Sequence, residues 1–315
     1  MVENVVSVAL PVDENLVVRK MRLTPDEVVG NEKRICIVTG THGDELEGQY
    51  VCYEMIKRIS AEKDKLKGIV DVYPAINPLG IDSITRGIPM FDLDLNRIFP
   101  GSVTDGAMPE YIAAKIIEDM SGADMAVDIH ASNIYLREIP QVRVNELTAE
   151  TLVPYAKLVT CDYVWVHSAA TVLESTLAHS LNSIGVKTLV VEMGVGMRIT
   201  KEYGDQLVDG LFNLMIELGI WDSKKRPIVK NPIVSTDHEV GFVNAEAAGL
   251  FVPSVEHWKN IRAGEVIGQI VNPLTGQVEE NVKSPIDGMI FTLREYPIVA
   301  VGSLIARILG GRSNA

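Results

Sequence analysis

The chain has 315 residues, of which 47% are hydrophobic and 23% charged, a balance typical of a globular protein with a substantial core. Its formal net charge of −13 would repel nucleic-acid phosphates and anionic lipid, so we expect neither nucleic acid nor a membrane as a partner. The N-terminal stretch carries Glu3 and no basic flank, and no apolar run is long enough to span a bilayer. The sequence therefore predicts a cytoplasmic protein.

The first part of the chain alternates between strand and helix patterns. Its first 30 residues predict edge strands or a hairpin. Further strands are expected at 34–39, 69–76, 124–130, 162–166 and 186–192, and helices at 45–60, 109–121, 147–159, 172–184 and 200–218. This alternation predicts an α/β fold with a mostly parallel mixed sheet flanked by helices.

Two segments depart from this alternation. Residues 77–110 are rich in Pro, Gly, Asp and Asn, and so long a loop in a compact domain indicates a functional segment. Beyond Lys224 the chain changes to short strands punctuated by Gly and Pro. We place a domain boundary at about residue 225, between an α/β domain at 1–225 and a β-rich domain at 226–315.

The cysteines show no metal-binding spacing. Cys36, Cys52 and Cys161 are scattered and odd in number, which favours reduced thiols in the core.

The stretch ICIVTGTHGDELEG places a histidine and a glutamate at the end of a predicted strand. His42 and Glu45 are three residues apart in a strand-to-helix turn, where both side chains can face one point. An imidazole nitrogen and a carboxylate oxygen suit zinc, which usually takes three protein ligands in a catalytic site. A third ligand must therefore lie elsewhere in the chain.

His130 is the candidate for that third ligand, because it ends the strand predicted at 124–130. The carboxyl ends of parallel strands meet at one edge of a sheet, where ligands bind. Asp128 lies on the same face of the strand as His130, so it would orient the histidine from behind. The alternative is that His130 is a structural residue without a metal.

Glu192 ends another apolar strand and is followed by a glycine-rich segment. A partly buried carboxylate at this edge of the sheet suits a general base beside a metal-bound water. The alternative is a carboxylate at the rim of the site that pairs with Arg198.

The long loop carries Arg86, Asn96 and Arg97. Guanidinium groups grip carboxylates in a two-pronged geometry, and an asparagine can hold the same group in register. The alternative is that these are solvated loop residues paired with Asp92 and Asp94.

Four motifs occur in the order GTHGDELEG, NPLG…TR…DLDLNRIFPG, DIHAS and VVEMG. In these motifs the chain resembles the succinylglutamate desuccinylase/aspartoacylase family of zinc carboxypeptidase-like deacylases, and the resemblance covers nearly the whole chain. It implies one zinc ion per chain, with His42, Glu45 and His130 as its ligands. It also implies that Glu192 activates water.

The same resemblance implies roles for the substrate-binding residues. Arg86 would help to polarise the scissile carbonyl, and Asn96 and Arg97 would bind the substrate carboxylate. Tyr296 is similar to a tyrosine that the C-terminal domain of the family contributes. Arg198 is a candidate for binding a side-chain carboxylate of the substrate. The segment AHSLNSIGVK lacks the arginine that aspartoacylase uses for this purpose. The loop after Arg86 is also longer than in aspartoacylase, so N-acetylaspartate is not the expected substrate.

The C-terminal segments KSPIDGMIFTL and VAVGSLIARI resemble the β-sandwich of biotinyl and lipoyl carrier domains. The Met-Lys-Met attachment site is absent, so we expect a sandwich that walls the active site or supports a homo-oligomer. His167 is the further histidine of interest, whereas His179, His238 and His257 are expected at the surface or in structural roles.

These observations predict a zinc-dependent amidohydrolase that removes an acyl group from a small anionic N-acyl amino acid or a related amide. One alternative is a metallocarboxypeptidase that acts on short peptides or cell-wall fragments. Another is a non-catalytic binding module in which the metal site is vestigial.

Overall fold

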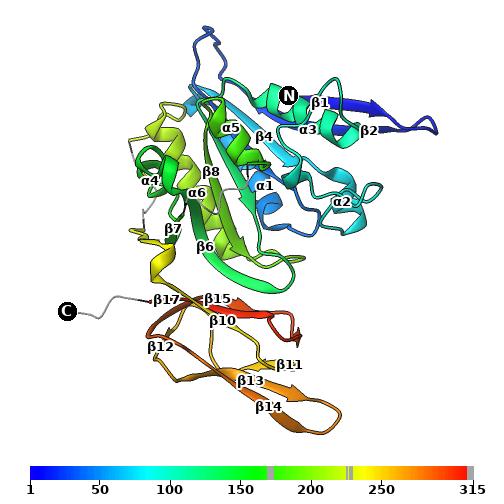
Figure 1. The fold of residues 1–315 in the computed structure, drawn as a ribbon. Helices are drawn as coiled ribbons and strands as arrows, with labels where there is room; N and C mark the ends of the chain where they lie inside the picture. Colours follow the sequence, from blue (N-terminus) through cyan, green and yellow to red (C-terminus); the bar gives the residue numbers. More distant parts are fainter. Residues whose placement is uncertain (169–173, 225, 227–229, 311–315) are drawn as a thin grey trace.

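The computed structural model describes residues 1–168, 174–224, 226 and 230–310 (Figure 1). It contains one large mixed sheet and one smaller antiparallel sheet, which confirms the expected α/β fold with a C-terminal β-sandwich. The strands up to residue 194 are β1 (Val2–Ala9), β2 (Asn15–Leu23), β3 (Arg34–Thr39), β4 (Ile69–Ala75), β5 (Met125–His130), β6 (Leu136–Asn145), β7 (Tyr163–His167) and β8 (Lys187–Gly194).

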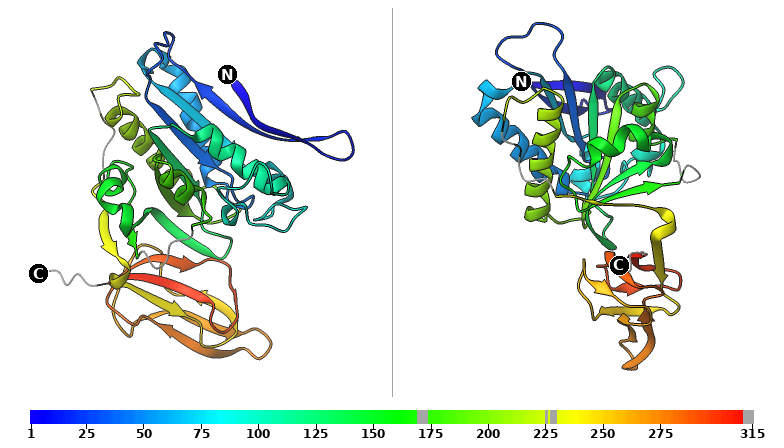
Figure 2. Two further views of the ribbon diagram at one scale, coloured as in Figure 1. Left: turned by 45° about the horizontal axis from the view of Figure 1, so that its top comes forward. Right: turned by 90° about the vertical axis from the view of Figure 1, so that its left-hand side faces the viewer.

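The centre of the large sheet is parallel. Strand β3 lies between β4 and β5, and β5 pairs with β8, all in the parallel sense. The antiparallel hairpin β1–β2 pairs with β4 at the outer edge and projects from the body of the molecule, as Figure 2 shows. The predicted strands at 34–39, 69–76, 124–130, 162–166 and 186–192 are confirmed within two residues at each end.

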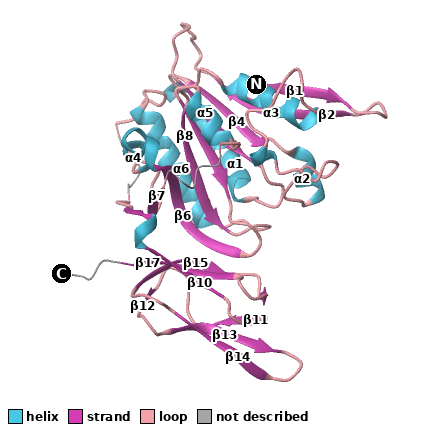
Figure 3. Cartoon of the chain, viewed as in Figure 1, coloured by secondary structure: helices cyan, strands magenta, loops and turns pink. Residues whose placement is uncertain are grey.

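Helices cover both faces of this sheet, as Figure 3 shows by colour. The α-helices are α1 (Glu47–Ala61), α2 (Pro78–Ser83), α3 (Met108–Met120), α4 (Ala149–Ala156), α5 (Leu177–Ser183) and α6 (Lys201–Glu217), and the described 3₁₀ turns are η1 (Lys63–Lys65), η2 (Leu95–Arg97), η3 (Glu146–Thr148) and η5 (Asp237–Glu239). Apolar residues of α1, α4 and α6 pack on one face of the sheet, and those of α3 and α5 pack on the other. Helix α5 is shorter than the predicted helix 172–184, of which residues 172 and 173 lie outside the described residues.

Strand β6 was not predicted from the sequence. It pairs with β8 in the antiparallel sense, while its other edge pairs with β15 through residues 136–138 and with β7 through residues 141–145. Its sequence, LREIPQVRVN, contains a proline and five residues that are charged or carboxamides, which weakens the apolar signal of a buried strand. These polar residues have partners in neighbouring strands, which a single-sequence pattern cannot show.

The C-terminal strands form a sandwich that is hydrogen-bonded to the large sheet. They are β9 (Ile233–Thr236), β10 (Val240–Asn244), β11 (Gly249–Pro253), β12 (Asn260–Ile261), β13 (Val266–Asn272), β14 (Gln277–Lys283), β15 (Gly288–Arg294), β16 (Ile298–Val299) and β17 (Leu304–Gly310). Strands β15, β17 and β10 extend the large sheet beyond β6, and β14, β13, β11 and β16 form the second sheet. One apolar cluster holds the two layers together. The predicted boundary at about residue 225 lies outside the described residues and stays a prediction.

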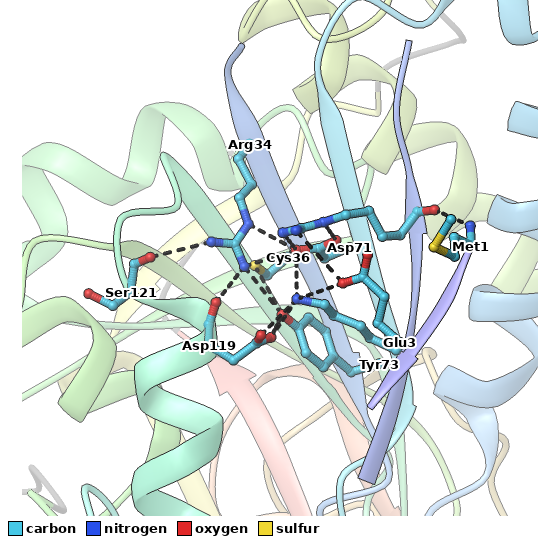
Figure 4. A network of polar contacts seen from close by, with 10 residues as sticks. Met1, Glu3, Arg34, Cys36, Asp71, Tyr73, Asp119 and Ser121 are labelled. Atoms are coloured by element: carbon cyan, nitrogen blue, oxygen red, sulfur yellow. Dashed lines mark hydrogen bonds and ion pairs between the residues drawn. The ribbon is translucent and has the colours of Figure 1, made fainter. Parts of the chain in front are cut away.

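A buried ionic network ties the N-terminal hairpin to the sheet (Figure 4). Asp71 on β4 accepts hydrogen bonds from Arg22 at 2.8 Å and from Arg34 at 2.9 Å, and Lys20 bonds to Asp119 at 2.7 Å. Because each buried charge has an opposite charge beside it, polar side chains are tolerated within these strands. Arg34 begins β3, so the network lies at the end of the sheet opposite to the strand ends considered below.

All three cysteines are free and buried, as expected from their spacing. Burial raises the pKa of the Cys36 thiol to about 12, so this thiol is not a reactive group at neutral pH. Among the described residues, no helix combines the length and the apolar character needed to cross a membrane.

Candidate metal centre and its cavity

Three predicted ligands meet at the carboxyl ends of two parallel strands. His42 and Glu45 lie in the turn between β3 and α1, and His130 is the last residue of β5. Because β3 and β5 are paired in register, with Thr39 beside Ile129, their ends bring these side chains together. One ligand atom from each of the three residues lies within 4.8 Å of the other two, and all three residues are buried.

The orientation of the three side chains fits a metal ion. The Nδ1 atom of His42 lies 2.7 Å from Oε1 of Glu45, and Nδ1 of His130 lies 3.0 Å from Oε2 of the same carboxylate. The Nε2 atoms of the two rings face aspartates, at 3.0 Å from Asp94 and 3.1 Å from Asp128. Two imidazoles that turn one nitrogen towards a shared carboxylate, each backed by an aspartate, form a donor set suited to zinc.

The same contacts shift the pKa values of the group. Burial alone would lower the pKa of His42, but hydrogen bonds with Asp94 and Glu45 raise it above the usual range. Burial is likewise outweighed at His130, where Asp128 and Glu45 raise the pKa well above its ordinary value. Burial would raise the pKa of the Glu45 carboxyl, but hydrogen bonds with the two histidines lower it to about 2. The carboxylate therefore stays ionised between two imidazoles that favour protonation when no metal is bound.

The turn that carries His42 is locked against the loop after β4. A Cβ atom on Gly43 would lie 1.9 Å from the carbonyl carbon of Gly80 in α2, so only glycine fits at this position. The N–H of Gly43 also donates to the carbonyl oxygen of Thr85 at 3.0 Å. Helix α2 is held in turn by Asn77, whose side chain accepts a hydrogen bond from the N–H of Gly80. The turn that carries His42 and the long loop thus form one packed unit.

Glu192 lies beside the three ligands. It is the backbone neighbour of His130 in the β5–β8 pair, and its side chain is 16% exposed. Its Oε1 atom lies 3.2 Å from Nη1 of Arg143, and burial raises its pKa although Arg143 partly opposes this shift. The alternative pairing with Arg198 is wrong, because Arg198 forms its ion pair with Glu295 at 3.1 Å. A carboxylate with a raised pKa at this place suits proton transfer.

The three loop residues also reach the cavity. Arg86 donates to Glu45 at 3.0 Å and to Asp94 at 3.3 Å. The alternative of an Arg–Asp pair within the loop is therefore present, and Arg86 also contacts the group of His42, Glu45 and His130, which we call the metal group. The side-chain oxygen of Asn96 accepts from the N–H of Leu177 at 2.9 Å, which fixes it at the start of α5. Arg97 is exposed, and its side chain bonds to the carbonyl oxygen of Asn96 at 2.8 Å.

One cavity of about 550 Å³ joins these residues. Its lining includes all the predicted metal ligands, Asp128, Glu192 and the three loop residues. Arg198, which is 66% exposed, and Tyr296, which is 43% exposed and packs edge-on against Tyr135, are not part of this lining. Their roles in substrate binding stay a prediction.

The structure adds residues that the sequence did not single out. These are Glu138 and Arg143 on β6 and Arg307 on β17. Two residues that were given other roles above also belong here: Asp94 lies behind His42, and His179 on α5 lines the cavity. His167, the further histidine of interest, also lines the cavity, with Nδ1 at 3.3 Å from Asp237. Asp94 could have been found from the motif DLDLNR, whereas the contacts of Arg307 come from distant parts of the chain.

Comparison with known proteins decides the family. The profile of the succinylglutamate desuccinylase/aspartoacylase catalytic domain matches residues 31–218, which span both histidines, Glu45 and Glu192. The chain belongs to the succinylglutamate desuccinylase/aspartoacylase family. This family consists of hydrolytic deacylases. No curated protein sequence matches the chain.

Several solved structures share the fold over most of the chain. A product-bound ectoine utilization protein EutE from Ruegeria pomeroyi has a TM-score of 0.82 at 21% identity, with 95% of this chain and 90% of that chain covered. A succinylglutamate desuccinylase from Silicibacter sp. TM1040 has a TM-score of 0.81 at 20% identity, with coverage of 93% and 88%. A succinylglutamate desuccinylase/aspartoacylase from Rhodobacter sphaeroides has a TM-score of 0.78 at 21% identity, with coverage of 95% and 91%. At these identities the likeness establishes the fold, including the C-terminal sandwich.

Proposed function

We propose that this member of the family is a zinc-dependent deacylase that hydrolyses a small N-acyl amino acid or a related linear amide. The observation that supports it most is the buried group of His42, Glu45 and His130 with Glu192 in the same cavity. A bound zinc ion would supply Lewis-acid polarisation and a lowered pKa for water at this group.

Different residues of the chain would carry out proton transfer, stabilisation of the oxyanion and substrate binding. Glu192 takes a proton from the attacking water and later passes it to the leaving amine, for which its raised pKa is suited. Arg86 donates to the carbonyl oxygen as negative charge develops on it. Asn96 and Arg97 bind the carboxylate of the amino acid, so the substrate is a small anion.

The first experiment measures amine release from a panel of N-acyl amino acids by the zinc-loaded protein. We expect Glu192→Gln to lower kcat by about 10²- to 10⁴-fold, the usual contribution of a general base, while the zinc content stays at that of the wild type. Glu202→Gln, on the exposed start of α6, is the matched control and should behave as the wild type. A Glu192→Gln variant with full activity would overturn the assignment of the base.

The same panel tests the alternative activity. Cleavage of short peptides, with little activity on acylated single amino acids, would indicate a metallocarboxypeptidase instead. A cytoplasmic location and self-association stay predictions from the sequence.

A further inference from the structure

A second cavity, of about 370 Å³, lies between α6 and the C-terminal sandwich. We call it the rear cavity, and we call the cavity that holds the metal group the metal cavity. Leu136 and Glu138 on β6 line the metal cavity, whereas the residue between them, Arg137, lines the rear cavity. Because successive residues of a strand face opposite sides of a sheet, β6 separates the two cavities. The polar side chains of the rear cavity belong to Arg137, Tyr203, Glu256, His257 and Glu295.

Arg137 brings a positive charge that no carboxylate neutralises by direct contact. Its side chain is half-buried, and its guanidinium group forms no ion pair with a carboxylate among the described residues. Burial raises the pKa of Tyr203, and the charge of Arg137 and a hydrogen bond with it oppose this rise, so the two groups are neighbours. Glu47 also feels this charge, but its two oxygens accept from the N–H of Thr200 at 2.6 Å and from its hydroxyl at 2.7 Å. The planar guanidinium fork thus retains donors for a ligand carboxylate.

Glu295 brings a negative charge near Arg137 without pairing with it. Leu293 lies opposite Arg137 in the β15–β6 pair, and Glu295 follows two residues later, where its N–H donates to the carbonyl oxygen of Tyr135 at 2.9 Å. Diagonal neighbours of this kind have Cβ atoms roughly 7 Å apart. The carboxylate of Glu295 pairs instead with Arg198, which is 66% exposed, and such surface pairs are weak. A cation and an anion therefore face one cavity with room for a ligand between them.

His257 adds a neutral polar group to this lining. Its Nε2 atom lies 2.8 Å from the carbonyl oxygen of Phe291, which can only accept, so this nitrogen carries the proton. Burial lowers the pKa of His257, and the charge of Arg137 acts in the same direction, so the imidazole is neutral at neutral pH. Its Nδ1 atom is then an acceptor. The rear cavity combines donors on Arg137 and Tyr203 with acceptors on His257 and Glu295.

This combination of charges selects against a simple ion. A lone anion such as phosphate would meet Arg137 but would be repelled by Glu295 and by Glu256, whose only ion pair among the described residues is with the exposed Lys259 at 3.5 Å. A lone amine would be repelled by Arg137. A ligand with a carboxylate and an ammonium group matches both charges, and an α-amino acid carries the two on one carbon atom. The volume falls within the range of about 300–1,000 Å³ for small-molecule sites.

We propose that the rear cavity binds a free α-amino acid, with its carboxylate at Arg137 and Tyr203 and its ammonium group at Glu295. The site lies apart from the metal cavity, and the proposal does not rest on the proposed function. An amino acid is also the class of amine that the proposed reaction would release.

The test is calorimetry on the zinc-loaded protein with three probes of matched carbon chain. L-2-Aminobutyrate carries both charges, butyrate lacks the ammonium group, and propylamine lacks the carboxylate. We expect L-2-aminobutyrate to bind at least tenfold more tightly than either of the others, because each of them leaves one charged group of the cavity unmatched. Equal affinity for butyrate would indicate a simple anion site and would overturn the proposal.

Variants locate the binding, since the carboxylate of an amino acid also suits Asn96 and Arg97 in the metal cavity. The titrations are therefore repeated in Arg97→Met protein, which should retain the binding. In that background Arg137→Met and Glu295→Gln should each raise the Kd of L-2-aminobutyrate at least tenfold. Arg262→Met, at an exposed turn of the sandwich, is the matched control and should leave the Kd unchanged.

The remaining outcomes also decide. Loss of binding in Arg97→Met protein would place the amino acid in the metal cavity and overturn the proposal. An Arg137→Met variant that is less stable but binds with the same Kd would show that this guanidinium group serves only to balance the buried Glu47. Should Arg137→Met fail to fold, Glu295→Gln and Tyr203→Phe decide by the same ratio of Kd values. If no amide is hydrolysed but this pattern of binding is found, the proposed function fails and the rear site stands.

Discussion

At the residue scale, the geometry of the three candidate metal ligands, His42, Glu45 and His130, depends on side chains outside this group. Asp94 and Asp128 lie behind the two histidines and fix which ring nitrogen points towards Glu45. Such partners orient the ligand and raise its basicity, so their loss weakens a metal site without removing a ligand.

Asp94→Asn should therefore weaken zinc binding by about 10- to 100-fold, since the amide keeps the size of the carboxylate but not its charge. The apparent Kd can be measured by competition with a chelator of known affinity. Asp92→Asn is the matched control, because Asp92 is exposed, lies in the same loop and has a φ of 50°, which asparagine tolerates. Equal Kd values for the two variants would contradict the role of Asp94.

Zinc binding should release protons. The pKa values of His42 and His130 are raised in the metal-free protein, and zinc binds the neutral imidazole. The apparent affinity should thus fall as the pH drops, and this fall should begin at a higher pH than for histidines with an ordinary pKa of about 6.5. Calorimetry in buffers of different ionisation enthalpy gives the number of protons released, and a value of zero at neutral pH would contradict the raised pKa values.

At the scale of elements, the site depends on the contact between the turn after β3 and helix α2. Gly43 and Gly80 touch through their backbones, so a methyl group at Gly43 must push α2 away. The displacement would move His42 and Arg86 together, because the turn and the loop are one packed unit.

Gly43→Ala should lower the free energy of unfolding by about 3 kcal/mol and weaken zinc binding. Gly122→Ala provides the comparison, because its added methyl group meets no atom within 4 Å and only its φ of +77° is unfavourable for alanine. That strain costs about 1 kcal/mol and should leave zinc affinity unchanged. Urea denaturation and metal competition on both variants distinguish steric overlap at the site from backbone strain elsewhere.

The strands and helices around the metal group could be predicted because they are apolar and periodic. The β3 turn, His130 at the end of β5 and Glu192 on β8 follow from strand ends in a parallel sheet. Strand β6 could not be predicted, since Glu138 and Arg143 are tolerated inside it only through partners on β8, β15 and β17. Glu138 and Arg307 are separated by 169 residues in the chain, and no local pattern reports such a contact.

At the scale of the whole molecule, the buried carboxylate of Glu138 links the catalytic sheet to the C-terminal sandwich. It accepts hydrogen bonds from Arg143 on β6, from Thr292 on β15 and from Arg307 on β17. Removing one partner from a buried ionic group leaves the remaining charges unpaired, and this cost exceeds the loss of a surface ion pair.

Glu138→Ala should lower the free energy of unfolding by about 3 kcal/mol, because two partly buried guanidinium groups lose their common acceptor, which is itself buried. Glu279→Ala, at an exposed position on β14, should change it by less than about 0.5 kcal/mol. Urea denaturation measures both values, and equal stability of the two variants would show that the sandwich is held mainly by its apolar contacts.

The hydrogen bonding of β6 to both β8 and β15 also bears on turnover. Hinge-bending between two lobes requires a joint that can change its backbone angles, whereas hydrogen bonds between strands on both edges of β6 resist such bending. We therefore expect the sandwich to remain fixed during the catalytic cycle, and exchange of substrate and product to depend on local loop movement. If the sandwich stays fixed, the end of the cavity that Arg307 lines keeps the same size for every substrate.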